Sequence, residues 1–313
     1  MKYVFPSYYK KFRCIGGKCA HNCCVADWEI DIDDDTFEFY KSIDGEIGQK
    51  LQKNIATNPT PHFIFKNGRC PFLNEENLCE LIVAFGDDAL CDICYEHPRF
   101  YNEIDDRLEA GVGLCCEEAG RLILGFEKPM TLECDESLES ENELLILREK
   151  VFCILQNRDK NIPARIDEML SVFSLKTPEF DVQKWASFLL SLERLEEKWT
   201  VLLEDLEENC KNADFIKFDE YMYDRQSEFE QLITYFIYRH FANSEDEKDA
   251  VLRVLFAFFG YQIIRALGAV EFSKTGEFSF ETLVEFSRLF SSEIEYSEEN
   301  FAKILNALNS YNQ

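Results

Sequence analysis

The distribution of cysteines constrains this chain more than any other feature. Ten of its thirteen cysteines fall between positions 14 and 116. They occur in tight groups, namely Cys14, Cys19, Cys23 and Cys24, then Cys70 and Cys79, then Cys91 and Cys94, then Cys115 and Cys116. Closely spaced thiolates converge on one metal or cluster with little backbone rearrangement, whereas adjacent cysteines pair poorly with each other in a disulfide. The spacing therefore predicts a metal-thiolate module in the first third of the chain.

A disulfide framework is the alternative interpretation of so many cysteines. It requires an oxidising compartment and usually a secretory signal. Residues 1–11 contain no apolar signal region and no small-residue cleavage site, and a chain of 313 residues can bury a core without disulfides. We therefore expect reduced thiols in a cytoplasmic protein. Cys134, Cys153 and Cys210 occur singly in helical patterns, which is typical of small core residues.

Composition and charge restrict the class of partner. Hydrophobic residues make up 46% of the chain, which is enough for a globular core. The apolar stretch 254–270 is interrupted by Arg265, and its charge-free part, 254–264, is shorter than the ~20 residues that cross a bilayer, so we expect a buried helix and no membrane association. The net charge of −27 repels nucleic acid and favours lysine-bearing protein surfaces, although acidity also serves solubility alone.

The pattern of elements predicts a mainly α protein, in which a helical bundle carries a small N-terminal cysteine-rich α+β metal-binding subdomain. We place the cysteine-rich domain at 1–132 and the helical domain at 133–313, with the acidic segment 133–143 at the boundary. Residues 28–33 alternate as a half-buried strand, and Asp33 or Asp34 caps a helix over about 35–50. The Asn67-Gly68 pair predicts a hairpin within 62–73.

Helical periodicity dominates the chain after about residue 141. Leu147, Val151, Ile154 and Leu155 share one face, and Asn161-Ile-Pro163 is a helix start. An apolar stripe runs from Trp185 to Leu206. Further helices are predicted at 227–241, 249–267, 280–290 and 298–310, and short helices at 88–94 and 116–124.

The identity of the metal stays open at this point of the argument. Zinc favours four ligands in a closed tetrahedron and is marked by paired Cys-x2-Cys knuckles. This chain has one such knuckle, Cys91 and Cys94. Irregular thiolate-rich spacing is also compatible with an iron–sulfur cluster. The Cys-x3-Cys-x2-Cys spacing of radical enzymes that use S-adenosylmethionine does not occur, because Cys24 follows Cys23 directly.

Several segments, taken together, resemble a known family. They are Tyr9-x2-Phe12-x-Cys14-x-Gly16-x2-Cys19-x3-Cys23-Cys24, the alternating segment 28–33, the segment 68–79 with its Cys70-Pro-Phe-Leu start, Leu90-Cys91-x2-Cys94-x3-Pro98-Arg-Phe100, the segment 116–124 and the helical segment 147–159. The chain resembles the putative zinc- or iron-chelating family named for a Cys-x2-Cys-x2-Cys-Cys motif, and within it the bacterial flagellin lysine-N-methylases. The resemblance covers nearly the whole chain.

This resemblance implies methyl transfer from S-adenosylmethionine to lysine side chains of flagellin, with a 4Fe–4S cluster in the cysteine-rich region. The predicted metal ligands are Cys14, Cys19, Cys23, Cys24, Cys70, Cys79, Cys91, Cys94 and Cys116. Cys115 is a spare beside Cys116. The chain departs from the family by its Cys-x4-Cys-x3-Cys-Cys spacing, which leaves the choice of ligands among these thiols open.

Lysine methylation imposes chemical requirements that suggest further candidates. The acceptor ammonium must lose a proton to a base or a desolvating pocket, and the donor sulfonium suits carboxylates and aromatic faces. Catalytic candidates near the cysteines are Glu29, Asp31, Tyr95 and His97, with Asp27 also nearby, and candidates for cofactor binding are Glu96 and Arg99. The alternative roles are a solvated strand face for the carboxylates and a surface position for the histidine.

Two other functions compete with the enzyme hypothesis. The first is a non-catalytic module in which zinc or iron only holds the fold together. The second is an electron-transfer protein, for which the sequence contains no partner motif. Neither a Gly-rich nucleotide loop nor an internal repeat occurs in the chain.

Overall fold

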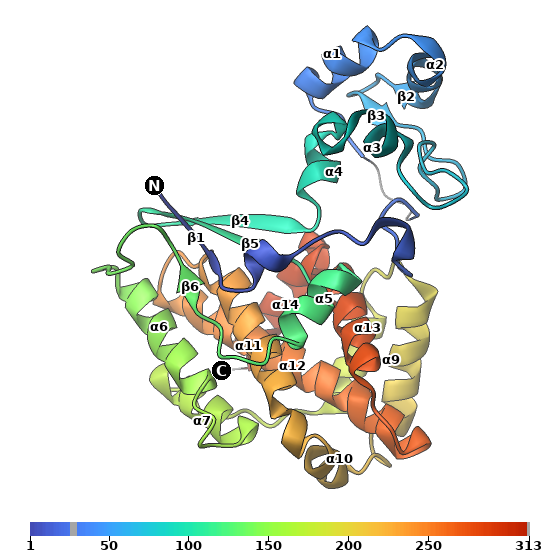
Figure 1. Cartoon of the computed structure of the whole chain (residues 1–313). Helices are drawn as coiled ribbons and strands as arrows, with labels where there is room; N and C mark the ends of the chain where they lie inside the picture. Colours follow the sequence, from blue (N-terminus) through green and yellow to red (C-terminus); the bar gives the residue numbers. More distant parts are fainter. Residues whose placement is uncertain (26–29, 312–313) are drawn as a thin grey trace. The chain divides into compact units, whose positions relative to one another are not determined.

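Helices make up most of the structure, a computed structural model that describes residues 1–25 and 30–311 (Figure 1). Fourteen α-helices lie in this part of the chain, with short strands between positions 2 and 133. The predicted mainly α fold with a small cysteine-rich subdomain is confirmed. By its contacts the chain forms two compact units. The helical unit contains residues 1–12, 101–115 and 119–313, and the cysteine-rich unit contains 13–100 and 116–118.

These units differ from the predicted division at 132/133 because the first strand joins the helices. Strand β1 (Lys2–Pro6) pairs in parallel with β5 (Arg107–Val112) and antiparallel with β6 (Leu132–Glu133), and β4 (Arg99–Ile104) completes the order β4-β5-β1-β6. The Tyr238 hydroxyl, from a helix, donates to the carbonyls of Val4 and Ala110 at 3.4 and 2.9 Å. The sheet therefore belongs to the helical unit, apart from the first two residues of β4.

The helical unit is built around two long buried helices. In α11 (Gln226–Phe241) every residue from Phe229 to Phe241 is buried. Helix α12 (Glu247–Thr275) is long and apolar enough to cross a membrane by length and composition alone, but 72% of its most apolar window is buried inside the protein. The apolar stretch 254–270 is thus a core helix, as its sequence predicts.

Eight further helices of the described residues belong to this unit, and the one at Phe215–Tyr221 was not predicted from the sequence. They are α5 (Glu117–Leu124), which begins in the cysteine-rich unit, α6 (Glu143–Leu155), α7 (Ile162–Val172), α8 (Val182–Leu190), α9 (Glu197–Asn209), α10 (Phe215–Tyr221), α13 (Phe280–Phe290) and α14 (Glu298–Tyr311). Asn161 caps α7 through a bond from the Ala164 N–H, as predicted. The stripe from Trp185 to Leu206 is divided between α8 and α9, and Leu195 between them is 69% exposed.

The cysteine-rich unit contains short elements only. These are α1 (Asp34–Ser42), α2 (Gly45–Asn54), β2 (Ile55–Ala56), β3 (His62–Phe63), α3 (Glu80–Phe85) and α4 (Asp92–Glu96). Asp33 caps α1 by accepting the Thr36 N–H at 2.8 Å, which confirms one of the two predicted caps. The prediction of a single helix over 35–50 is wrong, because helix α1 ends at Ser42 and α2 begins at Gly45. The φ of +79° at Gly45 favours glycine.

The Asn67-Gly68 turn forms as predicted, with φ values of 52° and 68° and paired backbone bonds between Lys66 and Arg69. The pairing partner of β3 is different from the prediction: β3 pairs with β2 in place of the chain after the turn. That chain continues into Cys70 and Pro71, and Pro71 has no N–H to extend a ladder.

Candidate metal centre

Backbone hydrogen bonds bring distant cysteine segments together in the cysteine-rich unit. The Cys70 N–H donates to the Cys24 carbonyl at 2.9 Å, joining positions that lie 46 residues apart. The loop after Cys70 then folds back on itself, with an antiparallel bridge between Leu73 and Cys79 and a bond from the Asn74 N–H to the Leu78 carbonyl at 2.9 Å. Local turn chemistry therefore returns Cys79 toward Cys70.

Six thiols interact with one another in this unit, and we call them the six-thiol group. They are Cys23, Cys24, Cys70, Cys79, Cys91 and Cys94. Hydrogen bonds join Cys23 to Cys24 and Cys91 to Cys94. Each pair also interacts electrostatically with Cys70, and Cys79 interacts with Cys24, Cys70 and Cys91.

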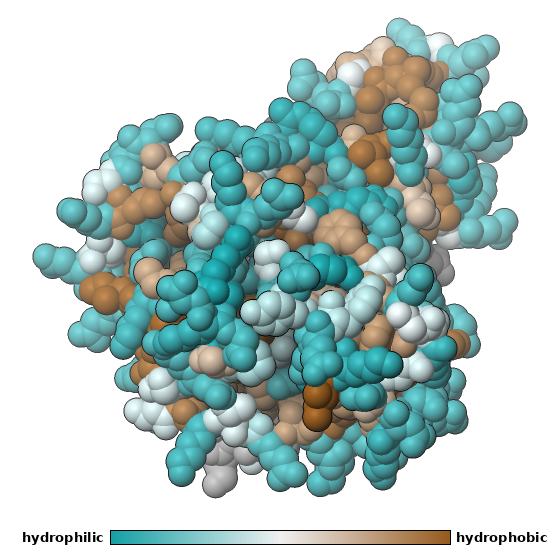
Figure 2. All heavy atoms as spheres, turned by 60° about the horizontal axis from the view of Figure 1, so that its bottom comes forward, coloured by the Kyte–Doolittle hydropathy of each residue, from teal (hydrophilic) through white to brown (hydrophobic). Residues whose placement is uncertain are grey.

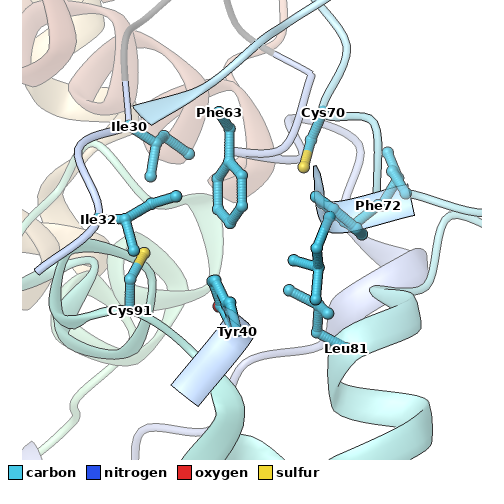
Figure 3. Packing of buried hydrophobic residues seen from close by; sticks show 10 residues of the cluster. Ile30, Ile32, Tyr40, Phe63, Cys70, Phe72, Leu81 and Cys91 are labelled. Atoms are coloured by element: carbon cyan, nitrogen blue, oxygen red, sulfur yellow. The ribbon is translucent and has the colours of Figure 1, made fainter. Parts of the chain in front are cut away.

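Five thiols of the six-thiol group, all but Cys23, lie in or against the apolar core of the unit. Cys91 is fully buried and Cys70 is 8% exposed, and both lie among Ile30, Phe63 and Phe72 (Figure 3). Cys24, Cys79 and Cys94 pack against the same cluster. All thirteen cysteines lie in the described part of the chain, and none of them forms a disulfide.

The surroundings keep most of these thiols protonated. Burial raises the pKa of Cys70 to about 11. Within the two hydrogen-bonded pairs, the bond lowers the pKa of Cys23 and Cys91 and raises that of Cys24 and Cys94. A bound metal would reverse this balance, because it stabilises thiolates and displaces their protons.

The remaining three predicted ligands lie outside the six-thiol group. Cys19 and Cys116 interact with each other, and burial followed by the charge of Glu117 raises the pKa of Cys19 to about 12. The Glu117 carboxylate accepts the N–H groups of Ala20 and His21, each at 3.1 Å. Cys14 is exposed, and its sulfur accepts the Gly16 N–H at 3.4 Å.

The structure separates the adjacent pair Cys115 and Cys116. Cys116 belongs to the cysteine-rich unit, whereas Cys115 belongs to the helical unit, where it contacts the hydroxyl of Tyr296.

The three isolated cysteines also differ among themselves. Cys210 is a buried core residue as predicted, but Cys153 is exposed on α6, and Cys134 follows a strand in place of lying in a helix.

The six-thiol group offers cysteine sulfurs alone as ligands. No three His, Cys, Asp or Glu side chains in residues 1–25 and 30–311 are placed as ligands of one metal ion. A four-iron cluster is held by four cysteine thiolates. Cysteine sulfurs without carboxylates or imidazoles are the ligands that such clusters use.

The predicted catalytic and cofactor residues are spread over the unit. Asp31 is exposed and accepts a bond from the Thr60 hydroxyl at 3.0 Å. Tyr95 is 49% exposed, with the Arg99 guanidinium over its ring. Burial lowers the pKa of His97 to about 4, so its imidazole is neutral at pH 7. Glu96 is half-buried beside it, while Asp27, Trp28 and Glu29 lie outside the described residues.

Two residues beside the thiols were not identified from the sequence as part of a site. The Asp33 carboxylate accepts the Asp92 N–H at 2.9 Å, at the start of the helix that follows Cys91. The Tyr40 hydroxyl donates to the Ala89 carbonyl at 2.7 Å and lies near the thiols of α4. The alternating pattern and the capping position single out Asp33 locally, but the partners of Asp33 and Tyr40, Asp92 and Ala89, are set by tertiary structure.

A surface cleft of about 410 Å³ lies in the same unit. It is lined by Gln49, Lys50, Lys53, Asn54, Lys66 and Pro71. The Lys50 ammonium forms an ion pair with the Glu80 carboxylate at 2.6 Å. The charges of Lys53 and Lys66 remain in the cleft. A cationic sulfonium donor is therefore disfavoured there.

The fold and these contacts define a class: a mainly α-helical protein with a separate unit in which cysteine thiols converge. Comparison of sequences gives the family. A profile described as the FliB lysine N-methylase C-terminal domain matches residues 136–313, and the chain belongs to this family.

Individual relatives align over a smaller part of the chain. It is 28% identical over 135 residues to the flagellar biosynthetic protein FliU of Salmonella muenchen, covering 41% of this chain and 79% of that protein. It is 27% identical over 142 residues to a lysine-N-methylase of Salmonella typhimurium, covering 41% of this chain but 33% of the relative. The lysine-N-methylase of Salmonella choleraesuis is also 27% identical, with 33% of its length covered. The chain thus spans about a third of the two lysine-N-methylases it matches, and no solved structure matches it.

Proposed function

We propose that this protein is a protein-lysine N-methyltransferase that uses S-adenosylmethionine and an iron–sulfur cluster, with flagellin as its substrate. Membership of the FliB lysine N-methylase family carries the proposal. The names of the relatives, lysine-N-methylase and flagellar biosynthetic protein, support the reaction and the flagellar substrate. We place this activity in the cytoplasm, where thiols remain reduced.

Cysteines of the six-thiol group would hold the cluster, with Cys19 and Cys116 as further candidates. When bound, a 4Fe–4S cluster supplies a redox-active centre whose irons also act as Lewis acids. The thiols exceed the four that one cluster requires, so the others support it or form a second site. Neutral His97, three residues after Cys94, adds no positive charge to repel the sulfonium donor.

The charge of the protein supports a lysine-bearing partner. A net charge of −27 attracts cationic surfaces over long range, and hydrophilic side chains dominate the face shown in Figure 2. Because the chain has no Gly-rich nucleotide loop, we assign donor binding to the cysteine-rich unit, away from the lysine-lined cleft. This attraction should weaken as salt screens the charges.

The first test is the metal itself. Anaerobically purified protein should contain iron and acid-labile sulfide. Single Cys→Ala changes across the six-thiol group should abolish both at the thiols that are ligands. Cys153→Ala, on an exposed face of α6, and Cys210→Ala, in the helical core, are matched controls that should keep them. Stoichiometric zinc without sulfide would refute the iron–sulfur assignment.

The second test is the reaction. Cluster-loaded protein is incubated anaerobically with labelled S-adenosylmethionine and flagellin. The lysines of flagellin are then analysed by mass spectrometry for increments of one methyl group. If cluster-loaded protein neither binds S-adenosylmethionine nor labels any lysine, the methyltransferase hypothesis is refuted.

A structural metal module is the second candidate function. The burial of Cys70 and Cys91 within the small apolar core favours it, because a metal there would stabilise the unit directly. Zinc-loaded protein that folds fully but transfers no methyl group would establish this alternative.

A further inference from the structure

Two short helices of the cysteine-rich unit expose apolar side chains that lie next to one another. Helix α3 buries Leu81 in the core of the unit, but its Val83 is 67% exposed. Ile82 and Phe85 of α3 and Phe39 of α1 are between 39% and 43% exposed. The rings of Phe39 and Phe85 meet edge to face, with their centroids 6.2 Å apart. We call Phe39, Ile82, Val83 and Phe85 the α1–α3 patch.

The stability of the unit does not explain this patch. The side chain of Val83 lies mostly in water, so it adds little to the core. Valine also forms helices less well than lysine or glutamate, which would suit an exposed position of α3 better. Single apolar residues on a surface are ordinary, whereas adjacent ones mark a site of interaction. The α1–α3 patch therefore has the character of a docking surface.

Carboxylates border the patch on both helices. Asp35 lies one helical turn before Phe39 on α1, and Asp87 and Asp88 follow within three residues of Phe85. All three carboxylates are exposed, and no ion pair involves them within residues 1–25 and 30–311. The border of the patch thus carries negative charge.

The charge of this border selects the partner. Lys41, the one basic residue of α1, is already paired with Glu38, so it does not neutralise the border. A second copy of the chain would bring like charges together, and the net charge of −27 opposes self-association further. A protein segment that carries lysines beside apolar side chains matches both the patch and its border.

We propose that the α1–α3 patch, bordered by Asp35, Asp87 and Asp88, docks a segment of the protein substrate in which lysines flank apolar side chains. The proposal rests on the proposed function, in which the substrate presents lysine to this enzyme. Cys79 of the six-thiol group directly precedes α3, so a docked segment would lie in the unit to which we assign donor binding.

The apolar part of the surface is tested with flagellin and the full protein. Val83→Ser should weaken flagellin binding, measured without the methyl donor, about tenfold because it removes an exposed apolar contact. In methylation it should raise KM for flagellin and leave kcat unchanged, since docking is separate from the chemistry. Val201→Ser, at a 53% exposed position of α9, is the matched control and should change neither quantity.

The acidic border is tested with a double variant, Asp87→Asn with Asp88→Asn. It should weaken flagellin binding and flatten the dependence of binding on salt, because two of the charges that salt screens are gone. Glu204→Gln with Glu208→Gln, which removes two exposed carboxylates of α9, is the charge-matched control and should keep the wild-type salt dependence.

The outcomes separate the docking surface from the enzyme. If wild type methylates flagellin but Val83→Ser and the Asp87/Asp88 variant bind it as wild type does, the docking surface is overturned and the proposed function stands. Binding that depends on the patch, without methyl transfer by cluster-loaded protein, would support the surface and refute the enzyme. Absence of flagellin binding to wild type would overturn the surface. A wild-type dimer that Val83→Ser converts to a monomer would assign the patch to a second copy and overturn the proposal.

Discussion

Buried carboxylates hold arginine side chains in the helical unit. Arg148 forms a two-pronged ion pair with Glu109, at 2.6 and 2.5 Å, and both side chains are fully buried. Arg107 lies 4.0 Å from the same carboxylate, and two of its nitrogens have no hydrogen-bond partner in the described residues. The pair connects β5 to α6, so it fixes the sheet on the helices.

Glu109→Gln should destabilise the protein by about 3–5 kcal/mol, because it leaves the buried charge of Arg148 without a counterion. Urea unfolding followed by circular dichroism measures this change. Exposed Glu143→Gln at the start of the same helix is the control and should cost less than about 1 kcal/mol. Similar losses in the two variants would contradict the role of the buried pair.

His97 should make stability depend on pH. Its folded pKa of about 4 lies below the ordinary value of 6.5 because burial disfavours the charged form. The unfolded chain therefore binds more protons between these values, so this contribution to stability is complete above pH 6.5 and is lost as pH falls toward 4. Between pH 7 and pH 5 the loss should be about 1–2 kcal/mol.

Comparison of wild type with His97→Gln isolates this contribution. Unfolding at pH 7 and at pH 5 should show a smaller loss in the variant. The same loss in both proteins would show that other groups cause the dependence.

Among the elements, the contact between α11 and α12 depends on a small residue. A Cβ atom at Gly260 of α12 would lie 2.7 Å from the ring of Phe236 in α11. Glycine costs a helix roughly 1 kcal/mol relative to alanine, so close packing offsets a local disadvantage. The two helices approach at this position because no side chain separates them.

Gly260→Ala should therefore destabilise the protein by about 1–3 kcal/mol despite its better helix propensity. Adding Phe236→Leu should restore part of the loss, since the shorter side chain leaves room for the methyl group. A double-mutant cycle of thermal unfolding measures the coupling. Additive effects would exclude the contact as the cause.

At the scale of the whole molecule, the two units differ in what holds them together. The helical unit has a large aromatic core around α11 and α12. The cysteine-rich unit has a smaller core, in which Cys70 and Cys91 take positions that apolar residues would otherwise fill. Its fold should therefore depend on metal far more than that of the helical unit.

Removal of metal by a chelator should raise hydrogen exchange in residues 13–100 while α11 and α12 stay protected. Hydrogen exchange measured by mass spectrometry resolves the two units, and protein treated with metal-saturated chelator is the control. Unchanged exchange in the cysteine-rich unit after complete metal loss would contradict a metal-dependent fold. An equal rise in hydrogen exchange in both units would contradict the prediction that only the cysteine-rich unit depends on metal.

Local sequence patterns determined the helices and caps of this protein. The periodicity of α6 and α11 to α14, the Asn161 and Asp33 caps and the Asn67-Gly68 turn follow from interactions within a few residues, which a sequence displays directly. The concentration of cysteines likewise indicated a thiol-rich subdomain. Predictions that assumed continuity, such as one helix over 35–50, were wrong where a turn interrupts the pattern.

Only the tertiary structure decided which distant residues meet. It separated six thiols from Cys14, Cys19 and Cys116, placed Cys115 in the other unit and assigned β1 to the helical unit. It also brought Tyr235 and Tyr296 to the segment before Cys116. Contacts of this kind depend on the packing of whole elements, and because many partners are compatible with a buried carboxylate or thiol, no local pattern selects among them.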